Sequence, residues 1–275
     1  MKKRVAYIEI ITASGNMKRL DGLNVRFNIN KRLGAVMNDA SISIANLTRD
    51  DVEYLTTFTS PWYAIAQRKR IRLFAGYEDT NTGLLFDGDI IEAMPTMPPD
   101  VWLNCKARSG NYGNCTMVSK SIQTQMPVKQ LLKEAGIWTG LTLEDTCTSE
   151  KSIAGFNFNG GVTQVIEQLN QIGGITVFED NGVLKAVDTD NPNINASERI
   201  ISKDSGMIGM PKFDPLGCEV TVLLDPTIKL GQKVRVVSER VPSASGTYWV
   251  YDINYNGETR GNPFYTVLKC RRFSV

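Results

Sequence analysis

Two adjacent carboxylate pairs in the middle of the chain, Glu144-Asp145 and Glu179-Asp180, are the residues whose types could support acid–base chemistry. A hydrolase that works with carboxylates alone needs two carboxyl groups that face each other at roughly 5–10 Å. Each pair ends a short strand-like run and lies beside turn-forming residues, which is typical of a solvated loop. We therefore interpret both pairs as solvated loop residues and assign no catalytic residue.

Histidine is absent from the 275 residues, and this limits the remaining chemistry. The chain lacks the commonest general base near neutral pH and the commonest metal ligand, so every histidine-dependent triad is excluded. Asp87-Gly88-Asp89 matches only a fragment of a calcium loop and lies in a strand-like run. The five cysteines include no CxxC pair, which argues against a zinc cluster and for reduced thiols. The sequence predicts no enzyme, no metal and no cofactor.

The net charge of +2 is unevenly distributed along the chain. Residues 1–112 carry +3, residues 113–195 carry −4 and residues 196–275 carry +3. We interpret the short basic clusters, such as Lys2-Lys3-Arg4 and Arg68-Lys69-Arg70, as strand-end charges on solvated or inter-subunit surface. The small surplus predicts little counterion release and weak affinity for DNA. No apolar run approaches the ~20 residues of a membrane helix, so we expect no membrane-spanning segment.

Residues 1–112 have the period-two pattern of β-strands, together with one short helix. The helix is predicted to begin after Thr48 as N-cap, with Asp50 and Asp51 in its first turn, where the helix dipole favours anions. Strands are predicted at Val5–Ile11, Val25–Asn30, Ala40–Ala45, Arg70–Ala75, Leu84–Ala93 and Val101–Arg108. Six strands around one helix predict a small barrel or a rolled sandwich.

Residues 113–190 change to a helical period. One helix is predicted from Pro127 at its first position to a stop at Gly136. A second covers Val162–Ile172 and places its apolar stripe on one face: Val162, Val165, Ile166, Leu169 and Ile172. Short strands are predicted at Leu141–Leu143 and Ile153–Phe158, and a hairpin is predicted from Ile175–Phe178 and Val183–Val187 around Asp180-Asn181-Gly182. The region is predicted to be a compact α+β insert.

Residues 191–275 return to strands after a polar stretch that ends near Asn193. Strands are predicted at Glu219–Leu224, Lys233–Ser238, Thr247–Tyr255 and Phe264–Arg271. The last two are rich in aromatic and β-branched residues, and residues 256–263 between them are dense in turn formers. They are predicted to form a long-looped β-hairpin.

The order of several short motifs is more informative than any one of them. The first region contains Ala40–Thr48, a strand that ends in Asn-Leu-Thr and opens a helix. Arg72–Tyr77, with its Ala-Gly-Tyr end, and Leu85–Ile90, with its Phe-Asp-Gly-Asp-Ile run, follow. The third region adds Asp225–Gly231 and the tyrosine-rich closing hairpin Gly246–Arg272. This order resembles the tail-tube-like hub family of contractile-tail phage baseplates.

The resemblance implies an α+β, mostly β fold, in which two tail-tube-like β-barrel or sandwich domains, residues 1–112 and 191–275, flank the α+β insert at 113–190. It further implies a structural protein of the virion tail baseplate, assembled in the cytoplasm of the bacterial host. Such a hub is a homotrimer that joins the six-fold tail tube to the three-fold central spike and contacts other baseplate proteins. It also lines the conduit through which DNA passes without specific binding.

Two other classes of function stay open on the sequence. One is a tail-associated, carboxylate-based peptidoglycan hydrolase, which would need a deep cleft with two opposed carboxylates, one of them with a raised pKa. The other is a β-module that binds host carbohydrate, which would need aromatic side chains clustered on one exposed face.

Three residues are candidates for contacts between subunits. Met94 and Met97 lie in a proline-rich, apolar loop, and prolines there cannot donate backbone hydrogen bonds. Arg260 lies in the turn of the closing hairpin, where a guanidinium can bind a neighbour's carboxylate with two hydrogen bonds.

Overall fold

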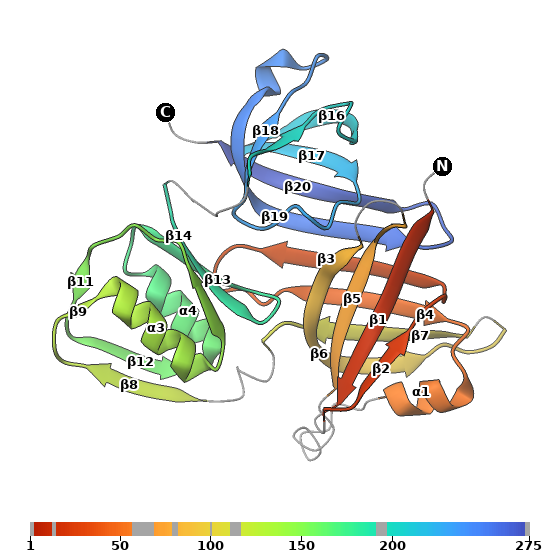
Figure 1. Cartoon of the computed structure of the whole chain (residues 1–275), viewed down its shortest axis with the longest axis horizontal. Helices are drawn as coiled ribbons and strands as arrows, with labels where there is room; N and C mark the ends of the chain where they lie inside the picture. Colours follow the sequence, from red (N-terminus) through yellow and green to blue (C-terminus); the bar gives the residue numbers. More distant parts are fainter. Residues whose placement is uncertain are drawn as a thin grey trace.

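The computed structural model describes residues 3–12, 15–56, 69–78, 82–99, 101–110, 117–190 and 197–272. Two β regions, from the first and last thirds of the chain, lie side by side, and an insert with helices and short strands projects from one end of them (Figure 1). The predicted α+β, mostly β fold class is therefore confirmed. The predicted boundary near residue 112 lies outside the described residues.

One long, almost entirely antiparallel sheet runs through both β regions. The strands of the first region are β1 (Arg4–Thr12), β2 (Met17–Leu20), β3 (Val25–Arg32), β4 (Asp39–Ala45), β5 (Lys69–Tyr77), β6 (Gly83–Pro95) and β7 (Trp102–Arg108). Those of the last region are β15 (Arg199–Ile201), β16 (Met207–Asp214), β17 (Gly217–Leu223), β18 (Lys233–Val236), β19 (Gly246–Glu258) and β20 (Phe264–Arg272). The strand order is β16-β17-β20-β19-β3-β4-β7-β6-β5-β1-β2, and β18 joins β15 to the beginning of β19.

The two β regions meet where β3 pairs with β19. Val25, Phe27 and Ile29 of β3 point inward, as the alternation predicts, and the buried side chains of both regions form a single hydrophobic cluster. Phe27 lies opposite Gly257 of β19, and a Cβ atom at that glycine would lie 2.3 Å from the Phe27 ring. A glycine at position 257 is therefore required for this close pairing.

Helix α1 (Arg49–Leu55) begins as predicted. The Thr48 side chain accepts a hydrogen bond from the Asp51 backbone N–H, which satisfies one of the free donors of the first turn. Leu55 is fully buried against the sheet, and Val52 and Tyr54 of the same helix pack against the core while partly buried.

The insert has its own sheets and its own hydrophobic cluster. Its elements are β8 (Val118–Ile122), β9 (Met126–Pro127), α3 (Val128–Thr139), β10 (Thr142–Asp145), β11 (Ser152–Ile153), β12 (Phe156–Gly160), α4 (Val162–Asn170), β13 (Ile175–Asp180) and β14 (Val183–Asp188). The stripe of α4 from Val162 to Leu169 is buried as predicted. None of the helices in the described part of the chain has the length and apolar character that crossing a membrane requires.

Helix α3 differs from its prediction at both ends. Pro127 is the N-cap rather than the first helical residue, and the helix continues through Gly136 to Thr139. Gly140, with a φ of 68°, is the C-cap. Gly136 is instead a packing residue, because a Cβ atom there would lie 3.2 Å from the Leu141 carbonyl oxygen.

Strands β2, β15 and β16 were not predicted from the sequence. The run in β16 contains Gly209 and Pro211, has a bulge between Ile208 and Lys212, and is exposed over most of its length. Only Pro211 is buried and Met207 is partly buried against the core, so the strand has no alternating pattern by which it could be recognised.

Candidate functional site: the polar junction and the exposed contact surfaces

The turn between β13 and β14 has the predicted hairpin geometry and is embedded in buried charge. Asn181 and Gly182 both have positive φ, 55° and 80°, as a two-residue hairpin turn requires. Around this turn gather Lys31, Glu179, Asp180, Asn181 and Lys185, which we call the polar junction.

Asp180 is the centre of the polar junction. The Lys31 ammonium donates to Asp180 Oδ1 at 2.6 Å and to Asn181 Oδ1 at 2.9 Å. The Lys185 ammonium donates to Asp180 Oδ2 at 3.3 Å. Each carboxylate oxygen of Asp180 therefore has its own cation, and the Lys31–Asp180 pair links β3 of the first region to the insert.

Glu179 and Asp180 are neighbours with opposite electrostatic environments. Burial disfavours ionisation of Asp180, but Lys31 and then Lys185 outweigh it and hold the pKa of that carboxyl below its ordinary value. Burial raises the pKa of Glu179, against hydrogen bonds from the Ser109 hydroxyl and the Gly182 N–H. Asp180 is thus stabilised as a carboxylate, whereas ionisation of Glu179 is disfavoured.

The prediction that Glu179-Asp180 is a solvated loop is wrong, since both residues are buried. The hairpin tip packs into the first β region, where the Asn38 side-chain amide donates to the Glu179 carbonyl at 3.1 Å. The sequence does hold a signal for this site: Lys31 occupies the inward phase of β3, in line with the buried apolar residues before it. A charge in that phase requires a buried counter-charge. Glu144 of the other pair is exposed, as predicted, but it lies in strand β10 rather than in a loop, and its carboxylate is 3.7 Å from Lys185 Nζ.

A second ion cluster adjoins the polar junction. Asp87 of β6 accepts hydrogen bonds from Arg70 Nη2 at 2.8 Å and Arg72 Nε at 2.9 Å, and its own N–H donates to Asn181 Oδ1 at 3.1 Å. Arg70 and Arg72 are therefore partly buried partners of Asp87 rather than free strand-end charges. Within the described ranges, no group of three or more carboxylate, cysteine or histidine side chains could hold a metal ion.

The cavities beside the polar junction do not pair two carboxyls for catalysis. One, of about 250 Å³, is lined by Glu144, Asp180 and both lysines of the junction, but the oxygens of Asp180 are occupied by these lysines. Glu179, whose pKa is raised, lines a different cavity of only about 10 Å³. The carboxyl with the raised pKa therefore does not line the cavity that Glu144 and Asp180 share.

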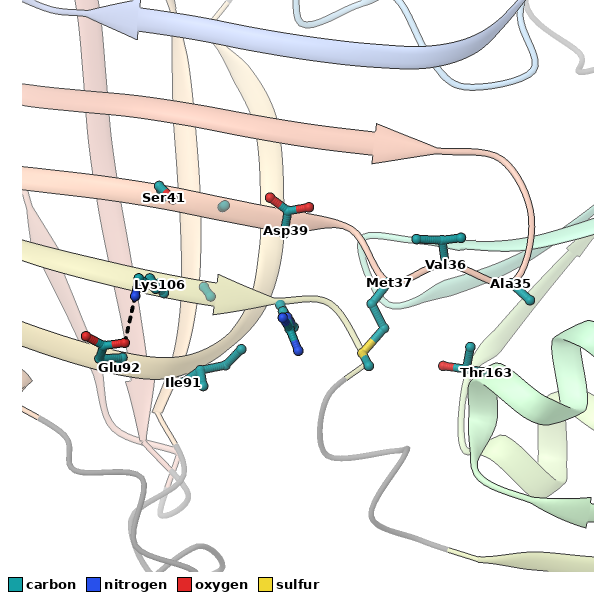
Figure 2. A pocket seen from close by; sticks show the side chains of 12 residues that line it. Ala35, Val36, Met37, Asp39, Ser41, Ile91, Glu92, Lys106 and Thr163 are labelled. Atoms are coloured by element: carbon teal, nitrogen blue, oxygen red, sulfur yellow. Dashed lines mark hydrogen bonds and ion pairs between the residues drawn. The ribbon is translucent and has the colours of Figure 1, made fainter.

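A larger groove of about 780 Å³ lies between the outer face of β4, β6 and β7 and the start of α4 (Figure 2). Its polar side chains carry both signs: Asp39 and Glu92, and Lys106 and Arg108. Lys106 Nζ donates to Glu92 Oε2 at 2.9 Å across the groove wall. Because its negative and positive side chains balance, the groove has no electrostatic preference for a polyanion.

Strands β6 and β19 both end on the side of the long sheet away from the insert (Figure 1), and the three predicted contact residues lie at or just after these strand ends. Met94, near the end of β6, and Met97, just after it, have exposed fractions of 41% and 87%. Arg260 follows β19 and donates through Nη2 to the Gly22 carbonyl of its own chain at 3.1 Å. Strands β3, β4 and β7 separate β19 from β6, so the methionines and the arginine do not form one patch.

In the described part of the chain, the long sheet ends in edge strands that were not predicted from the sequence. Among the described strands, β16 pairs only with β17 and β2 pairs only with β1. Strand β16 exposes Ile208, Met210 and Phe213, and β2 exposes Met17. Exposed apolar side chains on an unpaired edge mark a surface that another chain can cover.

Solved structures with this fold come from phage tails and a secretion system. The tail protein from Neisseria meningitidis MC58 has a TM-score of 0.66 and 9% identity over 98% of this chain and 97% of that chain. The 43 kDa tail protein of prophage MuSo2 from Shewanella oneidensis has a TM-score of 0.62 and 12% identity over 99% and 97%. The E. coli c3393 protein, a component of the type VI secretion system, has a TM-score of 0.62 and 9% identity over 91% and 74%. No curated protein matches the sequence.

The fold is thus that of phage-tail and related secretion-particle proteins. Within this class, the family model described as "Baseplate hub gp41" matches residues 8–270, and the chain belongs to this family of baseplate hub proteins. The resemblance found in the sequence is confirmed, and the family is one of the virion tail.

Proposed function

We propose that this protein is the structural hub of a contractile tail baseplate, a homotrimer that joins the six-fold tail tube to a three-fold central spike. The observation that carries the proposal is the long sheet whose end strands, β16 and β2, are unlike and have no second partner among the described strands. No residue has a catalytic role in this function, and neither metal nor cofactor takes part.

The unlike ends favour a ring. A contact between β16 of one copy and β2 of the next is head-to-tail, and such contacts close into a ring when the rotation fits. Closure removes the exposed edges, which are otherwise a liability for a strand-rich protein. Three copies, each with tube-like domains at residues 1–112 and 191–275 and an insert at 113–190, give the pseudo-six-fold symmetry that a six-fold tube can match.

The hub lines a conduit through which DNA passes without specific binding. The net charge of +2 and the mixed charges of the groove beside β7 supply little counterion release. Tail tube proteins, the central spike and other baseplate proteins are the expected partners, and host cytoplasm is the expected place of assembly.

The proposal is tested by the mass of the protein in solution and by the symmetry of its layer in purified particles. Ile208→Lys introduces a charge on the exposed face of the β16 edge and is expected to leave folded monomers. Ile137→Lys is the matched control, because Ile137 is an exposed isoleucine of the insert, on α3. Sedimentation of the wild-type and control proteins as trimers, with a monomeric Ile208→Lys protein, supports the ring.

Two results would contradict this function. A layer with a single copy per particle and no three-fold axis would exclude the hub. If Ile208→Lys formed trimers as stable as those of the wild type, the β16 edge would be excluded as the contact. This result would leave the hub function standing if the particle has a three-fold layer.

A further inference from the structure

Two of the cysteines face each other across neighbouring strands. Cys218 of β17 lies directly opposite Cys270 of β20, and both side chains are fully buried on the same side of the sheet. The four cysteines that the structure describes, Cys105, Cys147, Cys218 and Cys270, are free thiols. Cys105, by contrast, is paired with Ile42 and Ala93 on its two sides.

The Cα atoms of this pair are close enough for a disulfide to span. Arg272 N–H donates to the Leu216 carbonyl at 3.1 Å, which makes that opposing pair a hydrogen-bonded one. Hydrogen-bonded and non-hydrogen-bonded pairs alternate along an antiparallel ladder, so Cys218–Cys270, two positions further, is also of the hydrogen-bonded type. Such pairs have Cα atoms about 5.5 Å apart, within the range of about 4.4–6.8 Å that a disulfide spans. Their Cβ atoms are about 5 Å apart against the roughly 3.5–4.5 Å of a disulfide, so the bond requires the two strands to approach slightly at this position.

The two thiols also differ in reactivity. A hydrogen bond from the Cys270 thiol lowers the pKa of Cys218 despite its burial, whereas the pKa of Cys270 is raised. Burial raises the pKa of Cys105 and of Cys147 to about 12. Since the thiolate is the nucleophile in disulfide exchange, Cys218 is the thiol that attacks first.

We propose that Cys218 and Cys270 are an oxidation site, at which a small-molecule disulfide converts the two thiols into a cross-strand disulfide. The Cys218 thiolate attacks one sulfur of oxidised glutathione, forming a mixed disulfide and releasing one glutathione thiolate. The Cys270 thiol then loses its proton and attacks the Cys218 sulfur of the mixed disulfide, which releases the second glutathione. Two protein thiols are oxidised by two electrons and one glutathione disulfide is reduced to two thiols.

The bond would tie the last strand of the described chain to its neighbour. β20 is held between β17 and β19, and β17 is next to the edge strand β16. A disulfide between positions 218 and 270 closes a loop that contains β18 and β19, and it stabilises the last region by limiting its unfolded conformations. Local opening of the sheet end admits the oxidant to the buried thiols.

The experiment is incubation of the folded full-length protein with oxidised glutathione, followed by non-reducing digestion and mass spectrometry. We expect a linked peptide pair that contains Cys218 and Cys270, with a mass two hydrogen atoms below the sum of the reduced peptides. We also expect a rise in Tm of about 5 °C that dithiothreitol reverses. Cys105→Ala is the matched control, because it removes a buried thiol from the long sheet without touching the pair, and it should keep both effects.

Cys218→Ala and Cys270→Ala should each abolish the linked peptides and the rise in Tm. The measurement on the wild-type protein decides the proposal even if these variants fold poorly. A wild-type protein that stays fully reduced at this pair, that stops at a glutathione adduct, or that forms the bond without a gain in Tm would overturn it.

Discussion

Replacement of Asp180 by asparagine would remove the negative charge from the centre of the polar junction without changing the size of the side chain. Asp180 contacts Lys31 at 2.6 Å and Lys185 at 3.3 Å, and its side chain and that of Lys31 are less than a tenth exposed. Asp180→Asn would leave the buried Lys31 ammonium without a counter-charge, and would leave Lys185 only the exposed Glu144 carboxylate at 3.7 Å. Removing one partner of a buried ion pair costs about 3–5 kcal/mol, so we expect a loss of that size in the free energy of unfolding.

Urea unfolding followed by tryptophan fluorescence measures this loss, because Trp138 reports on the insert and Trp249 on the last β region. Glu179→Gln is the matched control, as it removes the adjacent carboxylate by the same chemical change. Ionisation of Glu179 is disfavoured in the folded state, so the control should be neutral or slightly stabilising at pH 7. A loss below about 1 kcal/mol in Asp180→Asn would refute the reasoning, because it would mean that water screens the lysines.

The pH dependence of the two variants should have opposite signs. The folded pKa of Asp180 is lowered, so its contribution is present above its unfolded pKa of about 3.9 and is lost as the pH falls through the folded value. The folded pKa of Glu179 is raised, so the wild type loses stability as the pH rises from about 4.3 through the folded value. Glu179→Gln should therefore gain on the wild type over that window. If the free energy of unfolding of the wild type and of Glu179→Gln changed in parallel with pH, this assignment would be contradicted.

Two further predictions concern the insert and assembly. Leu169→Ala removes a fully buried side chain from α4 and should lower the free energy of unfolding by about 2–5 kcal/mol in urea titrations; a change near zero would mean that the stripe does not support the insert core. Arg260→Glu should leave the thermal unfolding of the monomer unchanged, because the residue is exposed, and should reduce the yield of trimers or particles in sedimentation; normal assembly would remove Arg260 from the interface.

Local signals in the sequence were sufficient for much of the fold. Thr48 caps α1, the stripe from Val162 to Leu169 is buried, and Asn181-Gly182 forms the hairpin turn, because in each case the information lies within a few residues. Gly136 was misread as a helix stop because its role is a contact with Leu141, which periodicity does not reveal.

The polar junction depends on contacts that a local pattern cannot show. The Lys31–Asp180 pair spans 149 positions, so the inward phase of Lys31 in β3 indicates a buried counter-charge but does not identify Asp180 as the partner. Strand β16 was not predicted for a different reason. Its residues Ile208, Met210 and Phe213 are exposed, on the surface that we propose is in contact with a neighbouring copy. Patterns in the sequence therefore predict the hydrophobic cores of the β regions and of the insert more readily than the polar junction and the exposed β16 edge.

The pairing of β3 with β19 has a consequence for the order in which the chain folds during synthesis. Arg32 pairs with Asp252, so 220 positions must be added before this partner exists, which takes roughly 10–45 s at about 5–20 residues per second. Throughout this interval the β3 edge, with Phe27 beside it, has no native strand to cover it, whereas the insert can complete its separate core. During synthesis the residues of the insert core are therefore all present while the long sheet still lacks β19. Until β19 is made, the exposed β3 edge can pair with another chain, so this interval is when the protein is most open to aggregation.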